Sequence, residues 1–419
     1  MKKIYYIYTL FFLLITAKSN FLNNYDVVWG VFIASLILLG IYNLRFYKRD
    51  LIIIGTFSLI YLGFVFSRHL VINNFPKEFL ISDIFFLFKY LMLSFVYCAY
   101  MKEELMNYLI KVFTHLAILS LGFYVIQLAG GAGLLANIGR TVQGILPYYE
   151  HPAEYTNFLL YTFDYLHQYR NSGFAWEPGV FGSFAVIILM LHFFKNDFQY
   201  DRTAWILTFA ILTTISTTAY LAFMVLLFMF YRVRGGKVNA AFVLILILAM
   251  TGAAYIPFMS EKIKETYEQD MAFLKDQDEF AFAVEYYDEY DDYMRLNRFA
   301  SMAFIIDNFG NKLWVGVSNG YSKMTSEKYG VDLERVYLSN GLIDFCAKFG
   351  LVGLVFVFFR YAKTLRIYLP TSETVFYGLM VFFVVHFGET IIALPFCLIF
   401  IFTADYLGKE ETKILENAA

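Results

Sequence analysis

Charged residues are scarce in this chain of 419 residues. Asp, Glu, Lys and Arg together make up 16% of it, whereas hydrophobic residues make up 59% and aromatic residues 21%. Soluble domains carry about 25% charged and roughly 45–50% apolar residues. The formal net charge is −2, so the chain lacks the excess of basic residues that nucleic-acid binding requires. The composition therefore excludes an ordinary soluble domain and a nucleic-acid partner, and it predicts a polytopic membrane protein.

Cysteine is almost absent as well, and recognisable metal and phosphate motifs are missing. Cys98, Cys346 and Cys397 each lie in an apolar segment without metal-ligand spacing, so we interpret them as small hydrophobic residues. The sequence shows no paired-histidine spacing and no glycine-rich phosphate loop. The stretch from Asp288 to Asp292 is acidic enough to bind a cation, but acidic residues interleaved with tyrosine on a loop are more often solvated. We therefore expect no metal and no cofactor.

What the chain does have is a series of long apolar stretches separated by basic clusters. The first, after Lys2 and Lys3, resembles a secretory signal peptide; it lacks a small-residue cleavage pattern, so we expect a retained first span. The Lys and Arg clusters orient the spans by the positive-inside rule. The apolar stretches lie at about 4–20, 27–44, 51–67, 80–100, 107–129, 178–195, 203–231, 238–257, 341–359, 371–388 and 390–407.

The segment 203–231 is the one stretch whose flanking charges conflict with a single span. Arg202 and Arg232 both favour the cytoplasm, and a single helix would invert the C-terminal half of the protein. A hairpin broken near 215–218 restores a consistent orientation. Each arm is shorter than the ~20 residues of a full span, so the hairpin is tilted, thins the bilayer or is partly re-entrant. The result is an all-α protein with about twelve spans and both ends cytoplasmic.

This topology places two long segments on the outer face, at about 130–177 and 258–338. The middle of the second, from Asp276 to Asp292, is acidic and aromatic. The predicted cytoplasmic loops are only a few residues long, and no internal repeat is visible. We therefore treat residues 1–419 as one integral membrane domain that acts on the outer face.

The residues 170–179, Arg-Asn-Ser-Gly-Phe-Ala-Trp-Glu-Pro-Gly, are the strongest candidate for chemistry in the first outer segment. The guanidinium of Arg170 can hold phosphate oxygens in a fixed fork. The carboxylate of Glu177 can accept a proton from a sugar hydroxyl, and the indole of Trp176 can stack on a sugar ring. The alternative is an ordinary interfacial loop with a tryptophan anchor.

The second outer segment contributes two arginines near its end. Arg298 opens a helix-like apolar stretch, as expected of an interfacial helix that carries a cation toward lipid phosphates; Arg295 lies three residues earlier. Snorkelling toward head groups is the alternative for both. Asn340 begins the next span, in which Gly350 and Gly353 permit close helix packing.

Further ionisable residues lie near the predicted span ends. His386 and Glu389 are one helical turn apart at the outer end of a late span, and ionisable groups at such depth are functional candidates. His151 and Glu154 are weaker candidates, because a solvated loop explains them. Four other residues in or beside spans are interpreted as structural partners: Lys89, His115, Asp344 and Lys348.

The ordered set of these features resembles the O-antigen polymerase and ligase superfamily of bacterial inner membranes. The resemblance covers roughly residues 165 to 405, and the first half of the chain matches only in its hydropathy profile. It rests on the segment 170–179, the Ser-Thr-Thr-Ala-Tyr break at 216–220, Arg298 with Gly316, and Asn340 followed by Gly350-x-x-Gly353.

The resemblance implies a metal-independent glycosyltransferase of the GT-C type. Such enzymes move a glycan from an undecaprenyl-diphosphate carrier to an acceptor on the periplasmic side of the inner membrane. Ligases of the superfamily carry a histidine two positions before the motif asparagine, and here that position is Leu338. The difference favours a repeat-unit polymerase for O-antigen, capsule or exopolysaccharide over a lipid A ligase.

The implied roles follow from the chemistry of each group. Arg170 and Arg298 would clamp the diphosphate, and Glu177 would act as base or orient the acceptor, with His386 or Glu389 in reserve. The remaining residues expected to bind substrate are Trp176, Arg295 and Asn340. Implied partners are the lipid-linked donor and acceptor, membrane lipids and a chain-length regulator protein.

Three other functions are compatible with the sequence. A ligase or a protein O-oligosaccharyltransferase would use the same donor with another acceptor. A transporter of lipid-linked glycans is disfavoured, because transporters show internal repeats and midplane charges. A scaffold subunit of the assembly machinery would tolerate changes at the outer arginines.

Overall fold

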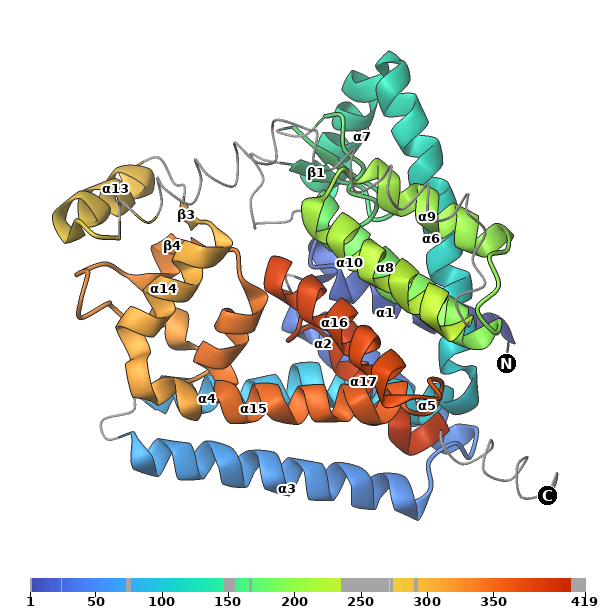
Figure 1. The fold of residues 1–419 in the computed structure, drawn as a ribbon, viewed down its shortest axis with the longest axis horizontal. Helices are drawn as coiled ribbons and strands as arrows, with labels where there is room; N and C mark the ends of the chain where they lie inside the picture. Colours follow the sequence, from blue (N-terminus) through green and yellow to red (C-terminus); the bar gives the residue numbers. More distant parts are fainter. Residues whose placement is uncertain are drawn as a thin grey trace.

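The computed structural model describes residues 2–23, 25–72, 77–146, 155–165, 168–234, 271, 274–289 and 293–407. Within these residues the chain is mainly helical (Figure 1). The span predicted at 238–257, His151 and Glu154 lie outside the described residues.

The helices follow the predicted apolar stretches closely. In the N-terminal half they are α1 (Lys2–Thr16), α2 (Asp26–Tyr42), α3 (Lys48–Val71), α4 (Lys77–Phe86), α5 (Met92–Met101), α6 (Leu105–Ile126) and α7 (Ala132–Ile145). In the C-terminal half they are α8 (Pro178–Lys195), α9 (Arg202–Thr213), α10 (Thr217–Val233), α13 (Gln277–Glu289), α14 (Arg298–Phe309), α15 (Gly341–Leu365), α16 (Ser372–Gly388) and α17 (Pro395–Leu407).

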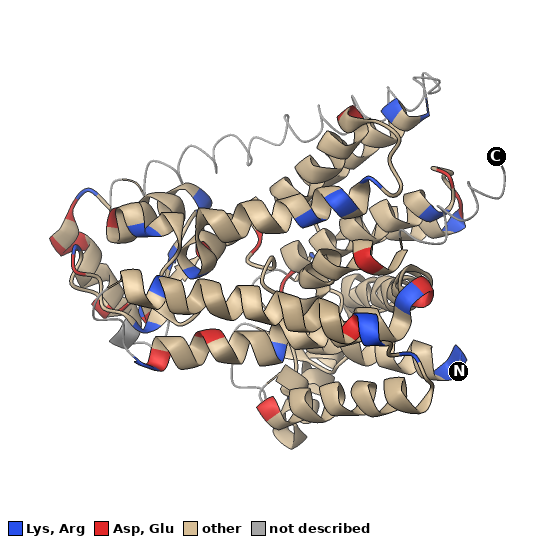
Figure 2. Cartoon of the chain, turned by 90° about the horizontal axis from the view of Figure 1, so that it is seen from below, with Lys and Arg blue, Asp and Glu red and all other residues tan. Residues whose placement is uncertain are grey.

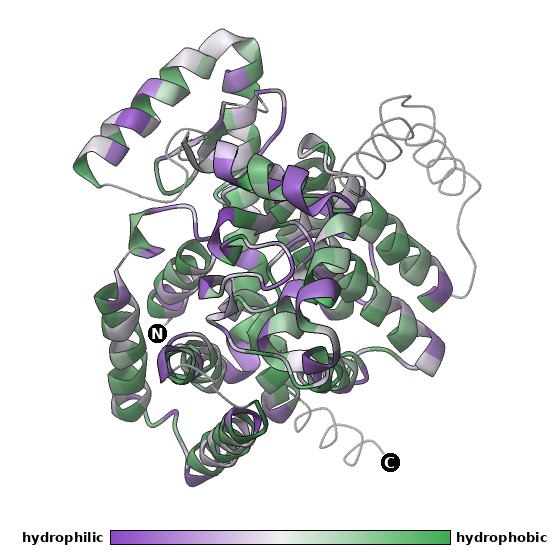
Figure 3. Cartoon of the chain, turned by 90° about the vertical axis from the view of Figure 1, so that its left-hand side faces the viewer, coloured by the Kyte–Doolittle hydropathy of each residue, from purple (hydrophilic) through white to green (hydrophobic). Residues whose placement is uncertain are grey.

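Four helical stretches are long and apolar enough to cross a membrane: Lys48–Val71, Lys77–Ile145, Pro178–Lys195 and Gly341–Leu365. Shorter apolar helices include α2, α9, α10, α16 and α17. On α3, large apolar side chains such as Leu59 and Leu70 are more than two-thirds exposed, as expected for a face that contacts lipid, and Figure 3 shows the helices mainly in hydrophobic colours. The chain is thus a helical membrane protein; the count of about twelve spans and the GT-C architecture stay predictions.

The hairpin predicted at 203–231 is present. The chain breaks at 214–216, where Ile215 has a positive φ of 47° and Ser216 caps α10 by accepting the Ala219 N–H. The ring of Phe193, near the end of α8, lies 5.7 Å from Tyr200 just before α9 and 4.8 Å from Phe230 near the end of α10. Since α10 returns to the place where α9 begins, the two helices are antiparallel.

The basic clusters gather at one end of the molecule, which we call the basic end. Asp405 of α17 pairs there with Arg360 and Lys363 of α15, and Arg232 of α10 pairs with Glu373 of α16 at 2.7 Å. Figure 2 shows charged residues toward the helix ends, with long uncharged stretches between. We call the opposite end, which carries the segments 155–177 and 293–340, the loop end.

The two predicted outer segments contain more structure than an all-α fold implies. β1 (Tyr155–Asn157) and β2 (Thr162–Asp164) pair antiparallel. β3 (Met294–Leu296) and β4 (Val336–Leu338) pair in parallel, with Leu296 opposite Leu338. Around β3 and β4, a small second core forms from side chains that include Phe280, Phe304 and Tyr329.

A contact between two glycines joins the second outer segment to the middle of α15. Gly316 and Gly350 have φ angles of 72° and 74°, and a Cβ on Gly316 would lie 2.4 Å from the Gly350 nitrogen. The Val317 N–H donates to the Ala347 carbonyl at 2.7 Å. Gly350, with ψ of 171°, occupies a backbone region that only glycine adopts readily, and α15 kinks there. This crossing of two backbones therefore explains Gly316 and Gly350, whereas a Cβ on Gly353 would meet the Phe349 side chain of the same helix at 2.8 Å.

The contact predicts that Gly350→Ala destabilises the protein. The left-handed backbone alone costs about 1–3 kcal/mol, and the added methyl group would lie 2.4 Å from the Val315 carbonyl carbon. A lower thermal unfolding temperature of the purified protein in detergent is the measurement. Gly63→Ala in α3 is the control, because a Cβ there meets nothing within 4 Å. Equal unfolding temperatures for the two variants would contradict the proposed packing.

Candidate functional site at converging helix ends

Four helix N-termini and one C-terminus meet at the loop end. Glu177 is the N-cap of α8, Arg298 is the first residue of α14, and Asn340 is the N-cap of α15. The first turn of α10 contributes Thr218, and the last carbonyl of α16 belongs to Gly388. Because a helix N-terminus carries unsatisfied N–H groups and a partial positive charge, this convergence favours anions.

Arg298 holds three of these helix ends together. Its Nε and Nη2 donate to the Gly388 carbonyl at 3.2 and 3.1 Å, and Nη2 also donates to Thr218 Oγ1 at 3.0 Å. The Arg298 carbonyl in turn accepts from Asn340 Nδ2 at 3.1 Å. The Arg298 side chain remains 38% exposed, so part of the guanidinium stays open to a ligand.

Glu177 and Glu389 form a carboxylate pair next to this arginine. Their side chains are hydrogen-bonded to each other, which requires one shared proton. Glu389 is 5% exposed, and its Oε1 lies 3.8 Å from Arg298 Nη2. Burial first, and then the Glu177 charge, raise the pKa of Glu389 well above its ordinary value, against the opposing effect of Arg298 and Arg170. The raised pKa favours the protonated form of Glu389, which can then donate the hydrogen bond between the two carboxyl groups.

Gly179 makes the pairing possible. A Cβ at this position would lie 2.2 Å from Glu389 Oε1, so any residue other than glycine at position 179 would displace the Glu389 carboxyl group. Pro178 occupies the first helical position, where its missing N–H costs little. The Glu-Pro-Gly sequence therefore has a local explanation: a cap, a helix start and a gap for the partner carboxyl.

Tyr337 on β4 adjoins the pair. Burial and the charges of Glu177 and Glu389 raise the pKa of its hydroxyl, and Thr390 hydrogen-bonds it. The Arg295 guanidinium carbon lies 6.0 Å from the Tyr337 ring centroid, within the range of a cation–π contact. Arg295 thereby reaches the site through Tyr337.

Arg170 approaches from the α9–α10 break. Its Nε donates to the Thr214 carbonyl at 2.9 Å, and its charge acts on Glu389. Trp176 is half-buried and packs against the edge of the main core. The first outer segment therefore brings a cation and an indole to the same end of α8 as the carboxylate pair.

His386 and Leu338 have other surroundings. The imidazole of His386 is fully buried, stacks on Phe382 and lies 3.4 Å from the Tyr361 hydroxyl, so it points into the helix bundle. Leu338 is partly buried and packs against the second core. The role of His386 as a reserve base stays a prediction.

Most of the residues selected from the sequence are thus neighbours in the fold: Arg170, Glu177, Arg298, Asn340 and Glu389 make the contacts above, and Arg295 joins through an aromatic ring. Three of the four residues interpreted as structural partners form ion pairs. Lys89 pairs with Asp26, and Lys348 pairs with Asp344. Sequence reasoning missed Tyr337, because nothing distinguishes it from the other tyrosines; Thr218 lay in the noted break, whose polarity was its only signal. In the part of the chain that the structure describes, no group of three His, Cys, Asp or Glu could hold a metal.

The carboxylate pair predicts a pH-dependent stability. A carboxyl group whose pKa is raised in the folded state stabilises that state while it is protonated. The free energy of unfolding therefore falls as the pH rises above the unfolded pKa of about 4.3 toward the raised folded pKa, by up to ~1.4 kcal/mol per pH unit. Glu389→Gln keeps a donor but cannot ionise. In thermal unfolding scans from pH 5 to 9, we expect the unfolding temperature of this variant to increase relative to that of the wild type as the pH rises. The exposed Glu334→Gln should follow the wild type; parallel curves for all three proteins would refute the shared proton.

Part of the chain matches a known protein family. A family model described as O-antigen ligase matches residues 203–358. The match contains the α9–α10 break, Arg298, Gly316, Asn340 and Gly350, whereas Arg170, Glu177 and Glu389 lie outside it. No curated protein matches the chain. Over residues 203–358 the chain is similar to the family described as O-antigen ligase, which confirms the predicted relation to the O-antigen polymerase and ligase superfamily.

Proposed function

We propose that the protein polymerises oligosaccharide repeat units carried on undecaprenyl diphosphate, by metal-independent glycosyl transfer at the loop end. The observation that carries the proposal is the convergence of four helix N-termini and two arginines on one carboxylate pair, next to a domain that matches the O-antigen ligase family.

The cationic side of the site suits a diphosphate. Arg298 keeps an exposed portion of its guanidinium, and Arg170 faces the same carboxylate from the other outer segment. Guanidinium groups and helix N-termini stabilise the charge that develops as the diphosphate leaves. Preorganised donors of this kind act without any metal ion.

The carboxylate pair suits the acceptor. The acceptor hydroxyl forms a bond to the anomeric carbon, its proton passes to Glu177, and the bond from that carbon to the diphosphate oxygen breaks, with the electron pair leaving on the diphosphate. Glu389, which is buried and hydrogen-bonded to Glu177, orients the Glu177 carboxyl group toward the acceptor. A general base must lie within hydrogen-bond reach of the proton that it removes.

Leu338 supports polymerase over ligase activity. An isobutyl side chain cannot accept a proton, and here it contributes to a core at the position where ligases of the superfamily carry a histidine. The same donor with a different acceptor, in a ligase or a protein O-oligosaccharyltransferase, is the second candidate, and the family description favours it.

Arg298→Ala in the native strain, expressed in a deletion background, is expected to collapse the ladder of surface polysaccharide to a single repeat unit. Loss of one preorganised donor lowers the rate about 10²–10³-fold. Arg298→Lys should recover part of the ladder, because it restores charge without the fork. Polysaccharide gels measure chain length, and immunoblots of membranes check that each variant accumulates.

The control is Arg140→Ala, which removes an exposed arginine from the same end, where its Nε donates to the Tyr165 hydroxyl. It should leave the ladder intact. A full ladder with Arg298→Ala would sink the proposal. Loss of all surface glycan on gene deletion, including the single-unit form, would instead point to a ligase or a transporter.

A further inference from the structure

A cavity of about 360 Å³ lies at the basic end, between α6 and the C-terminal end of α8. His192, in its wall, is fifteen residues from Glu177 along α8, roughly 22 Å at the rise of an α-helix. The cavity is therefore separate from the carboxylate pair, and a ligand bound in it would be independent of the proposed glycosyl transfer.

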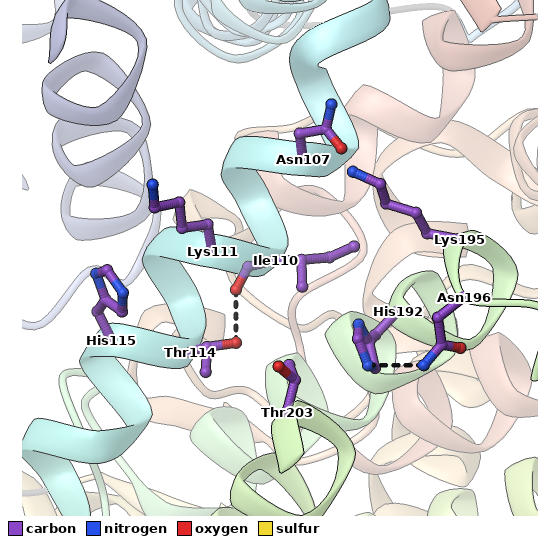
Figure 4. A pocket seen from close by; sticks show the side chains of 9 residues that line it. All are labelled: Asn107, Ile110, Lys111, Thr114, His115, His192, Lys195, Asn196 and Thr203. Carbon is purple, nitrogen blue, oxygen red and sulfur yellow. Dashed lines mark hydrogen bonds between the residues drawn. The ribbon is translucent and has the colours of Figure 1, made fainter. Parts of the chain in front are cut away.

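Two short polar stripes line this cavity, one on α6 and one at the end of α8. In Figure 4, Asn107 points toward Lys195, whereas Lys111 and His115 extend on the side of α6 away from α8. On α6, Asn107, Lys111 and His115 repeat every four residues and so lie on one helix face. On α8, the residues at the end are His192, Lys195 and Asn196. Both helices are otherwise apolar. Polar and ionisable groups are costly within membrane helices, and clusters of them mark binding sites.

The two lysines bring an excess of positive charge to the cavity. In the part of the chain that the structure describes, neither Lys111 nor Lys195 forms an ion pair, and the cavity wall contains no Asp or Glu. Two carboxylates lie near the wall: Asp201 bonds His192 at 2.8 Å, and Glu104 accepts from Asn107 at 3.0 Å and acts electrostatically on Lys195. The cavity therefore favours an anion.

The face of α6 below the lysine is apolar and exposed. Ile118 and Leu119, seven and eight residues after Lys111, are 46% and 44% exposed, and Ile126 is 43% exposed. A polar pocket that continues into an exposed apolar strip on the same helix face matches a lipid, with the headgroup in the pocket and an acyl chain along the strip. A free anion would not need the strip.

We propose that this cavity binds a phosphate-bearing anion, the headgroup of an anionic phospholipid from the leaflet at the basic end. Lys111 and Lys195 contact the phosphate, Asn107 and His115 hydrogen-bond the headgroup, and the strip from Ile118 to Ile126 holds a chain. Basic pockets between membrane helices bind anionic headgroups in this manner.

Native mass spectrometry of the purified full chain tests the site, with phosphatidylglycerol, phosphatidylcholine of the same chains, and inorganic phosphate as probes. Phosphatidylglycerol should be retained and should raise the unfolding temperature, whereas phosphatidylcholine should not. Lys111→Gln with Lys195→Gln should weaken phosphatidylglycerol binding at least about tenfold. Lys111→Arg with Lys195→Arg should retain it, which separates loss of charge from failure to fold.

The matched control is Lys48→Gln with Lys363→Gln, which removes two exposed lysines from the same end outside the cavity. An equal loss of binding in this control, or unchanged binding in the Lys111 and Lys195 glutamine variant, would overturn the site. Inorganic phosphate is the third probe. If it raises the unfolding temperature of the wild type as much as phosphatidylglycerol does, and does not raise that of the glutamine variant, the site binds phosphate. The proposal that its ligand is a lipid would then be overturned.

Discussion

Every helix that ends in or near a membrane leaves several N–H or C=O groups without partners, and a bilayer offers no water to satisfy them. At the loop end, side chains satisfy these groups: two of them are N-caps of their own helices, and one comes from a neighbouring helix. Asn340 caps α15, Ser216 caps α10, and Arg298 takes the last carbonyl of α16. The contacts that close these helix ends are the same contacts that assemble the candidate site. The candidate site is therefore built from residues that also hold helix ends together.

The same constraint explains how two carboxyl groups tolerate each other. One buried carboxylate beside another is unfavourable unless a proton is shared and positive charge is close. Glu177 sits on a helix N-terminus, and two arginines flank its partner. The positive ends of the surrounding helices add to this field. The arrangement places the negative charge of the pair beside two arginines.

Much of this was accessible from sequence because hydropathy and charge decide helix position and direction. The hairpin at α9 and α10 followed from Arg202 and Arg232 alone, and the order of Arg298, Gly316 and Asn340 led to the family that the comparison confirms. The sequence could not predict which of these side chains lie close together in the fold. Glu389 and His386 are one turn apart in the chain, yet Glu389 belongs to the carboxylate pair and His386 points into the bundle, because α16 ends between them. Tyr337 shows the reverse case, in which a strand pairing brings an ordinary tyrosine to the site. The four strands are each three residues long, which is too short for an alternation of polar and apolar residues to be detected in the sequence.

The glycine contact between Gly316 and Gly350 divides α15 into two parts with different surroundings. Residues 341–350 are mostly buried, whereas residues 351–360 are largely exposed along an apolar face. The first part is fixed to the second outer segment by two crossing backbones, and the second part meets lipid. The crossing therefore marks the boundary between a part of α15 that packs against protein and a part whose apolar face is open to lipid. Asn340 and the helix ends around it belong to the first part.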